Sequence, residues 1–282
     1  MRIPVPYSLF LRAGDLGWSC GQCPLDREGV VATPDDGPAQ ARLVVRHAEA
    51  TLRGAGMGAD DLRMAVVYHD LADPGGALAI LRAAFGPQVL MVPVACPAFY
   101  YPGMRIEVDL FADRGDSLRF GTGPGPGVPV IDHIAVPART PGLPPHALIH
   151  PGLTAPVRWT VHAPGDAQPH TLHTGGAEVQ VRRGDGILGL TALAPGLAGL
   201  VPQTEAVMMA LDVALTEEGL SFADVVKSTT HYCGEPTPQD LHDNMAVRNR
   251  CYRSPGPAST GIRVSELAAR GALTAVSLLA LR

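Results

Sequence analysis

The sequence contains only one lysine, Lys227, among its 282 residues. Lysine and arginine together number 22 against 27 aspartates and glutamates, so the formal net charge is −5. Proteins that bind nucleic acid through its phosphates carry clustered cations and an excess of positive charge. We therefore expect no nucleic-acid partner, and Schiff-base catalysis would have a single candidate residue.

Long apolar runs are also missing. No uninterrupted apolar segment reaches the roughly 18 residues that a membrane span requires, and residues 1–4 lack the apolar core of a signal peptide. Hydrophobic residues make up 46% and charged residues 17% of the chain, a balance that argues against disorder. We expect a soluble, cytoplasmic protein with no membrane partner.

Cysteine is scarce, and its number is odd, which favours free thiols. Cys20 and Cys23 have the spacing of a redox CxxC motif, but Pro24 follows where such a motif begins a helix. A structural role is therefore favoured for this pair. Neither a second CxxC nor an HExxH motif is present to complete a metal site. We expect no metal and no cofactor.

The spacing of apolar residues indicates an α+β fold. It predicts two short strands within residues 6–21, a helix over 39–55, a strand over 62–68, a helix over 74–85, and strands over 88–95 and 104–112. This order gives a mixed sheet with both helices on one face.

The pattern returns in the second half of the chain. Asp61 follows Gln40 by 21 residues, and Asp224 follows Gln203 by the same 21 residues, each before an apolar strand. A repeat of this length indicates duplication. We expect one domain over residues 1–120, a Pro/Gly-rich linker over 121–155, and a similar domain over 156–282.

Several short motifs carry a family resemblance. The first half contains PYS, RAGD and SCGQCPLD at residues 6–8, 12–15 and 19–26, and the second contains RN and PASTGI at residues 248–249 and 257–262. These motifs resemble the YjgF/Rid family of imine and enamine deaminases, which have a chorismate-mutase-like fold. The tandem arrangement is more distantly similar to that of the chorismatases.

The resemblance implies a trimer with ligand clefts between neighbouring sheets. It also implies an arginine that binds the substrate carboxylate and a glutamate that positions the hydrolytic water. The glutamate position matches Asp109 in the first half and falls near Ser277 in the second. The arginine position falls near Val89 in the first half and near Ser259 or Thr260 in the second. Its loss favours a substrate without an amino-acid carboxylate.

Charged residues alternate with apolar ones from position 105 to 110. This period places Arg105, Glu107 and Asp109 on one face of a strand. Two neighbouring carboxylates shift each other's pKa, which suits acid–base catalysis. The alternative is a solvated strand face on which Arg105 is the counter-ion. Under the catalytic interpretation, Asp109 and Glu107 are the acid–base candidates.

Other residues are candidates for the same site. His231 ends a strand and is a candidate catalytic partner. Six more residues are candidates for substrate binding, because they are aromatic, cationic, close to the family motifs or, for the thiol, close to His231. They are Phe99, Tyr101, Cys233, Arg248, Thr260 and Arg263.

Together these features favour a cofactor-independent enzyme of a biosynthetic pathway. Its acid–base chemistry would be cyclisation with dehydration, or imine–enamine hydrolysis, on a conjugated amine or keto intermediate. A chorismatase-like hydrolase and a non-catalytic ligand-binding protein are the alternatives. The expected partners are a small-molecule substrate and further copies of the chain, as a trimer or a dimer.

Overall fold

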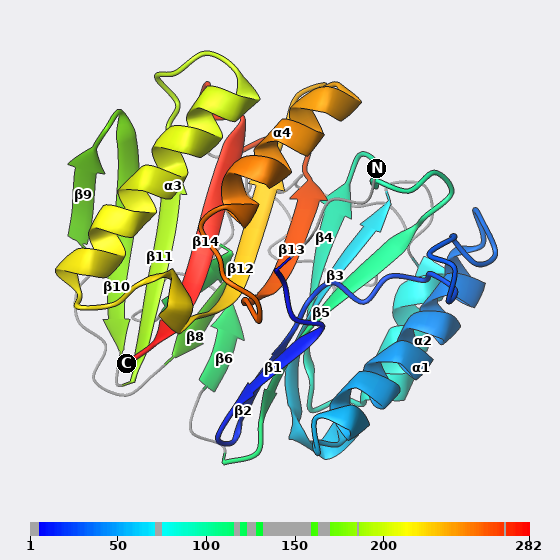
Figure 1. Cartoon of the computed structure of the whole chain (residues 1–282). Coiled ribbons are helices and arrows are strands. Elements are labelled where there is room, and N and C mark those ends of the chain that lie inside the picture. Colours follow the sequence, from blue (N-terminus) through cyan, green and yellow to red (C-terminus); the bar gives the residue numbers. More distant parts are fainter. Residues whose placement is uncertain are drawn as a thin grey trace.

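The computed structural model describes residues 6–70, 75–115, 119–122, 128–131, 159–162, 170–184, 186–267 and 269–282. Two sheets, each with two helices on its outer face, form most of the molecule (Figure 1). The α+β fold predicted from the sequence is confirmed.

The first sheet has the strand order β1-β2-β5-β3-β4. Helices α1 and α2 cover one face of it. The elements are β1 (Phe10–Ala13), β2 (Leu16–Ser19), α1 (Gly37–Gly54), β3 (Leu62–Asp70), α2 (Gly75–Phe85), β4 (Leu90–Cys96) and β5 (Ile106–Asp113).

The second sheet has the order β13-β12-β14-β11-β10-β9, and helices α3 and α4 lie on its outer face. Its elements are β9 (His170–Thr174), β10 (Ala177–Gly184), β11 (Ile187–Leu193), α3 (Leu200–Glu217), β12 (Val225–Tyr232), α4 (Pro238–Asn249), β13 (Ala258–Arg263) and β14 (Thr274–Leu281).

Strand pairing shows that the two domains are repeats. β3 pairs in parallel with β4 and antiparallel with β5, and β12 pairs in the same way with β13 and β14. The central strand of each domain begins with a bulge, at Leu62/Met64 and at Val225/Lys227. Two similar domains in one chain, as the sequence repeat predicts, are therefore confirmed.

The repeated glutamines perform the same task in both domains. The Gln40 side chain donates to the carbonyls of Thr33 and Gly103 and accepts from the Arg105 amide. Gln203 likewise joins the loop before its helix to the turn before β14, with hydrogen bonds of 2.7 to 2.9 Å. Because both amides are fully buried, these bonds fix each helix against the start of its last strand.

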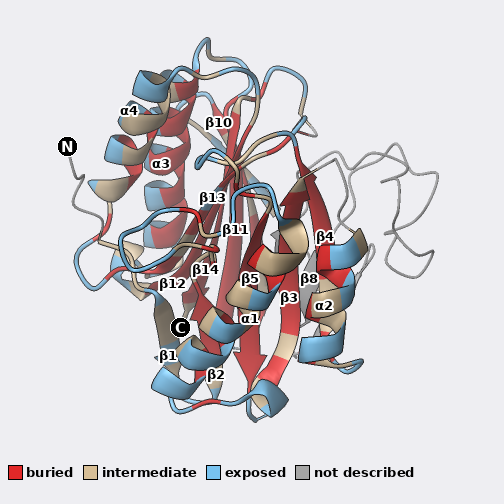
Figure 2. Ribbon diagram, turned by 90° about the vertical axis from the view of Figure 1, so that its right-hand side faces the viewer, coloured by how far each residue is buried: buried red, intermediate tan, exposed pale blue. Residues whose placement is uncertain are grey.

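The inner faces of the two sheets pack against each other. One apolar cluster contains Trp18, Tyr68 and Phe111 from the first sheet together with Ile262 and Leu279 from the second. Figure 2 shows these buried strands between the helices of the two domains. The domains thus share a core, which fixes any site formed at their boundary.

Three short strands form a separate sheet with the order β6-β8-β7. They are β6 (Arg119–Thr122), β7 (Val128–Ile131) and β8 (Trp159–His162), and β7 contacts β10, β11 and β14. The predicted domain boundaries at residues 120 and 155 remain predictions, because most of the segment between them lies outside the described residues.

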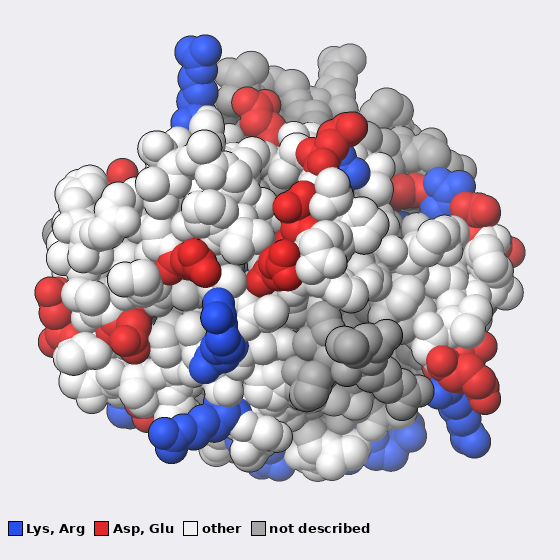
Figure 3. Space-filling view, turned by 45° about the horizontal axis from the view of Figure 1, so that its top comes forward, with Lys and Arg blue, Asp and Glu red and all other residues white. Residues whose placement is uncertain are grey.

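Charged side chains are dispersed over the surface that Figure 3 shows, among a majority of uncharged residues. Within the described part of the chain, no helix is both long enough and apolar enough to cross a membrane.

Candidate active site

A cleft of about 380 Å³ lies where the two domains meet. The first domain contributes the segment after β2, the β4–β5 loop and β5, and the second contributes β13, α4 and the end of β12. Its lining includes Tyr7, Cys23, Phe99, Tyr100, Tyr101, Glu107, Tyr232, His242, Asn244, Arg248, Ser259 and Arg263. The volume is within the range of small-molecule sites.

Strand β5 directs two carboxyl groups toward the second domain. Ile106, Val108 and Leu110 pack in the core beneath α1 and α2. Since side chains alternate along a strand, Glu107 and Asp109 lie on the opposite face, where both are buried. The alternative of a solvated strand face is therefore wrong.

Arg105 is not the counter-ion of these carboxylates. It lies just before β5 and pairs with Asp70 and with Asp35, the latter at 2.9 Å between Nη2 and Oδ1. Its guanidinium is one-third exposed, so these ion pairs contribute little to stability. The polar partners of Glu107 and Asp109 are therefore other residues than Arg105.

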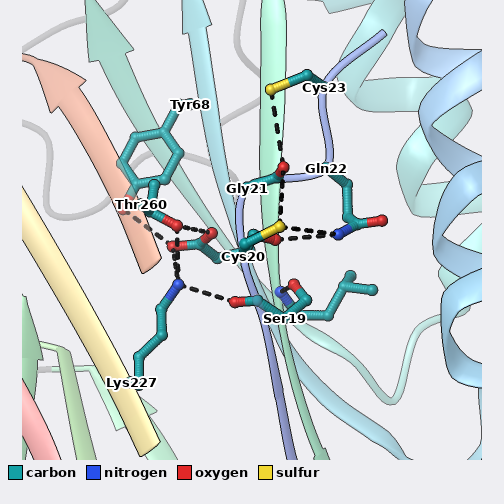
Figure 4. Close-up of polar contacts among 10 residues, drawn as sticks. Ser19, Cys20, Gly21, Gln22, Cys23, Tyr68, Lys227 and Thr260 are labelled. Atoms are coloured by element: carbon teal, nitrogen blue, oxygen red, sulfur yellow. Dashed lines mark hydrogen bonds and ion pairs between the residues drawn. The ribbon is translucent and has the colours of Figure 1, made fainter. Parts of the chain in front are cut away.

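Asp109 is held in a polar cluster that joins the domains. Its Oδ2 is 3.0 Å from Lys227 Nζ, and Thr260 donates to its Oδ1 at 2.5 Å. Lys227 also donates to Thr260 Oγ1 and to the Ser19 carbonyl, at 2.8 and 2.9 Å (Figure 4). Tyr68 completes the cluster with a hydroxyl 3.5 Å from Oδ2. The single lysine is thus committed to an ion pair inside the protein.

Glu107 faces the cleft and has a different environment. Burial, followed by the negative charge of Asp109, raises its pKa from 4.5 to about 8, which outweighs the opposing effects of the Cys23 thiol and Lys227. Gly21 lies directly against this carboxyl group, because a Cβ there would be 1.6 Å from Glu107 Oε1. At neutral pH the group is therefore mostly a protonated acid.

Aromatic side chains form much of the cleft wall. Phe99, Tyr100 and Tyr101 come from the β4–β5 loop, and Tyr7 and Tyr232 come from the two sides of the domain boundary. Tyr100 is half exposed and packs edge-on against Tyr101, with ring centroids 5.1 Å apart. Such a wall suits a planar ligand.

Two arginines of the second domain also line the cleft. Arg248 is 8% exposed; its Nε donates to Asn244 Oδ1 at 2.9 Å and its Nη1 to Thr230 Oγ1 at 3.0 Å. Arg263 donates to the Gly234 carbonyl and lies 3.8 Å from a carboxylate oxygen of Glu235. The two cations therefore differ, because only Arg263 has an acidic neighbour among the described residues.

The structure separates the remaining predicted site residues from the cleft. His231 is fully buried, with its ring 5.9 Å from that of Tyr68. Thr260 belongs to the Asp109 cluster, and Cys233 donates to the Ala272 carbonyl at 3.2 Å. Of the predicted residues, the cleft brings together Phe99, Tyr101, Glu107, Arg248 and Arg263.

Sequence reasoning missed several cleft residues. Tyr7 is one of them, and its place in the PYS family motif was the available signal. A bridge between Ser8 and Ala258 holds this motif beside β13, at the cleft. Tyr232 and Asn244 have no comparable signal, since their roles depend on how β12 and α4 meet the first domain.

The pKa values of the two CxxC thiols are raised, whereas a redox pair has a lowered thiol pKa. Burial raises the pKa of Cys20 to about 12 and that of Cys23 well above its usual value. Both thiols lie near the Gly21 carbonyl, at 3.6 and 3.7 Å. Reactive thiols need a lowered pKa, so the pair fits a structural role.

Potential metal ligands do not gather in the described part of the chain, where no group of three or more His, Cys, Asp or Glu side chains meets. Most of the histidines between residues 133 and 170 lie outside the described residues.

No family model and no curated protein matches the sequence. Solved structures that the chain resembles include a YjgF/YER057c/UK114 family member from Mycobacterium tuberculosis, at 25% identity over 38% of this chain and 86% of that one, with a TM-score of 0.33. The Escherichia coli YjgF gene product is 24% identical over 39% and 88%, with a TM-score of 0.35. E. coli TdcF, solved with bound serine, is 21% identical over 40% and 91%, with a TM-score of 0.36. The chain is therefore structurally similar to YjgF/Rid proteins over about 40% of its length.

Proposed function

We propose that the protein is a cofactor-independent enzyme of a biosynthetic pathway, with its acid–base site in the cleft between the two domains. The observation that carries the proposal is Glu107, a cleft-facing carboxyl group whose pKa burial and Asp109 raise to about 8. A carboxylic acid that stays protonated at neutral pH is able to donate a proton to a bound substrate.

Asp109 supports this role without entering the cleft. It is 1% exposed and is bound by Lys227 and Thr260, so its contribution is the negative charge that keeps the proton on Glu107. Asp109 is therefore proposed as a positioning residue. Two carboxyl groups on one strand thus take two roles because one has a cation beside it and the other does not.

The reaction begins with proton transfer from Glu107 to a nitrogen, oxygen or carbon atom of a conjugated substrate. In imine hydrolysis, the protonated imine adds water, and the adduct releases the amine and leaves a carbonyl. In cyclisation with dehydration, the proton goes to the hydroxyl group that departs as water. In each case the Glu107 carboxylate then accepts a proton, which restores the acid.

The aromatic wall favours a conjugated amine, enamine or keto compound as substrate. Phe99 and Tyr101 line the cleft, and planar conjugated groups pack well against aromatic rings. We also propose that the protein assembles with further copies of itself, as the sequence predicts. The described cleft itself has walls from both domains of one chain.

The test is a spectroscopic assay with freshly generated imines and enamines and with ring-closing keto-amine substrates. Glu107→Gln should lower kcat by at least about a hundredfold, the usual contribution of a general acid. Glu205→Gln, which removes an exposed carboxylate on α3, is the matched control and should retain full activity. Activity that survives in Glu107→Gln would overturn the proposed role, and absence of any turnover would favour ligand binding without chemistry.

A further inference from the structure

Helix α3 exposes apolar side chains on the outside of the second domain. Met209 is 67% exposed and Val213 is 40% exposed, and residues four positions apart are neighbours on a helix surface. The acidic residues Asp212 and Glu217 lie beside them and are exposed as well. We call these four residues the α3 ridge. Exposed apolar side chains that gather in one place and have a polar rim mark interaction surfaces.

A groove of about 760 Å³ lies beside helix α1 on the first domain. Its apolar lining includes Leu9, Leu25 and Leu43, and Leu9 is 62% exposed. We call it the α1 groove. An open apolar groove of this kind is able to receive the apolar side chains of a helix.

The two surfaces carry charge of opposite sign. Arg27 and Arg46 are exposed at the α1 groove, where one acid, Asp26, also lies. The Oδ1 atom of Asp26 accepts from two amides of its own loop, at 2.9 and 3.0 Å. The α1 groove is therefore apolar with a net positive rim, which complements the apolar α3 ridge and its acids.

The two surfaces use equivalent helices of the duplicated chain. Arg46 lies six residues after Gln40, and Met209 lies six residues after Gln203, so the cation and the exposed apolar side chain are counterparts. Helices α1 and α3 lie apart, on the outer faces of different sheets (Figures 1 and 2). Because the domains share a core, the ridge of one chain cannot reach its own groove.

We propose that the α3 ridge of one copy docks in the α1 groove of a second copy, with its apolar centre on the leucines and its acids near the arginines. This inference rests on the proposed self-association and names the surfaces that form it. The contact is heterologous, so copies join head to tail into a ring or an open chain. It differs from the contacts between sheets that the family resemblance implies, because the inner sheet faces are packed within one chain here.

Sedimentation velocity over a range of concentrations measures the association. The mass should rise with concentration up to about 100 µM, because specific contacts of modest area have a Kd in the micromolar range or below. Met209→Ser removes the apolar centre of the ridge, and Arg46→Glu repels its acids. Each should weaken the association at least about tenfold. Asp60→Arg reverses an exposed charge outside both surfaces, so this control should associate as the wild type does.

A mixture of the two variants tests the head-to-tail geometry. Met209→Ser keeps an intact groove and Arg46→Glu keeps an intact ridge, so an equimolar mixture should form a dimer of one chain of each that grows no further. A mixture that stays monomeric would overturn the contact. So would a wild type that is monomeric throughout the range, or association that survives unchanged in both variants.

Further variants and a separate readout keep the result decisive. If circular dichroism shows that Met209→Ser or Arg46→Glu does not fold, Val213→Ser or Arg27→Glu takes its place on the same surface. Sedimentation does not depend on turnover, so an inactive protein would leave this inference intact. Association that neither surface affects would remove the inference and leave the proposed self-association standing.

Discussion

Replacing Glu107 by glutamine should change the pH dependence of stability, whether or not the substrate is known. The carboxyl group is 8% exposed, and its pKa rises from 4.5 to about 8 in the folded protein. An acid whose pKa is higher in the folded state binds its proton more tightly there. Its contribution to stability is therefore complete below pH 4.5 and is lost as the pH rises to about 8.

The size of the effect follows from the shift. One pKa unit corresponds to about 1.4 kcal/mol, so the wild type should lose on the order of 4 kcal/mol through this group between about pH 5 and pH 9. Glutamine does not titrate and should lose none of it. Subtracting the two proteins cancels the titration of groups that the substitution leaves unchanged, and isolates position 107.

Urea unfolding followed by tryptophan fluorescence, to which Trp159 and the buried Trp18 both contribute, would measure both proteins at each pH. We expect Glu107→Gln to gain stability relative to the wild type steadily across this range. Glu205→Gln, on an exposed part of α3, controls for the loss of one negative charge. A difference between wild type and Glu107→Gln that is the same at pH 5 and pH 9 would refute the reasoning, because Glu107 would then be ionised throughout.

Two further predictions concern the groups around this carboxyl. Lys227→Met should cost about 3–5 kcal/mol of unfolding free energy, because it leaves Asp109 buried without a cation, and Lys227→Met/Asp109→Leu should recover most of that loss. Arg250→Met, which breaks an exposed ion pair with Glu205 at 3.8 Å, is the control and should cost less than about 1 kcal/mol by the same urea assay. If Lys227→Met and Arg250→Met lose equal stability, the buried ion pair does not stabilise the protein as argued. Gly21→Ala should lower turnover at least tenfold, because its Cβ would lie 1.6 Å from Glu107 Oε1, and an unchanged kcat would show that the carboxyl position is unimportant.

Local signals were sufficient to predict most of the fold. The predicted helix over residues 39–55 corresponds to α1, which begins after Asp36; the side chain of this residue accepts from the Ala39 amide at 2.9 Å, and Pro38 occupies the first turn. The spacing of Gln40 and Gln203 predicted the duplication, because the same buried hydrogen bonds recur in both domains. Periodicity and repeats are readable from one sequence because they depend on neighbours along the chain.

The cleft was predictable only in part, because it depends on contacts between the domains. Alternation along β5 placed Glu107 and Asp109 on one face, but it could not show that Lys227 would reach Asp109. From the sequence alone, this single lysine is a candidate for a Schiff base, whereas the structure buries it in an ion pair. Tyr232 and Cys233 follow His231 in the sequence, but its full burial follows from the packing of one sheet on the other.

The register of the two repeats shows that the carboxylate at this strand position occurs in the first domain alone. Asp109 pairs with Val66 across β5 and β3, and Ser277 pairs with Thr229 across β14 and β12, so the two positions are equivalent. Ser277 bonds to Thr191 at 3.1 Å and carries no charge.

The cation shows the reverse distribution. The bulges at the start of the central strands make Met64 the counterpart of Lys227, and Met64 is buried in the shared apolar core. The first domain thus keeps the carboxylates and the second keeps the lysine, while each counterpart is neutral. A carboxylate is costly to bury alone, and so is an ammonium group, so neither half of this arrangement is stable without the other. The duplicated chain therefore specifies one charged interdomain cluster, and Glu107 owes its raised pKa partly to the Asp109 charge that this cluster holds in place.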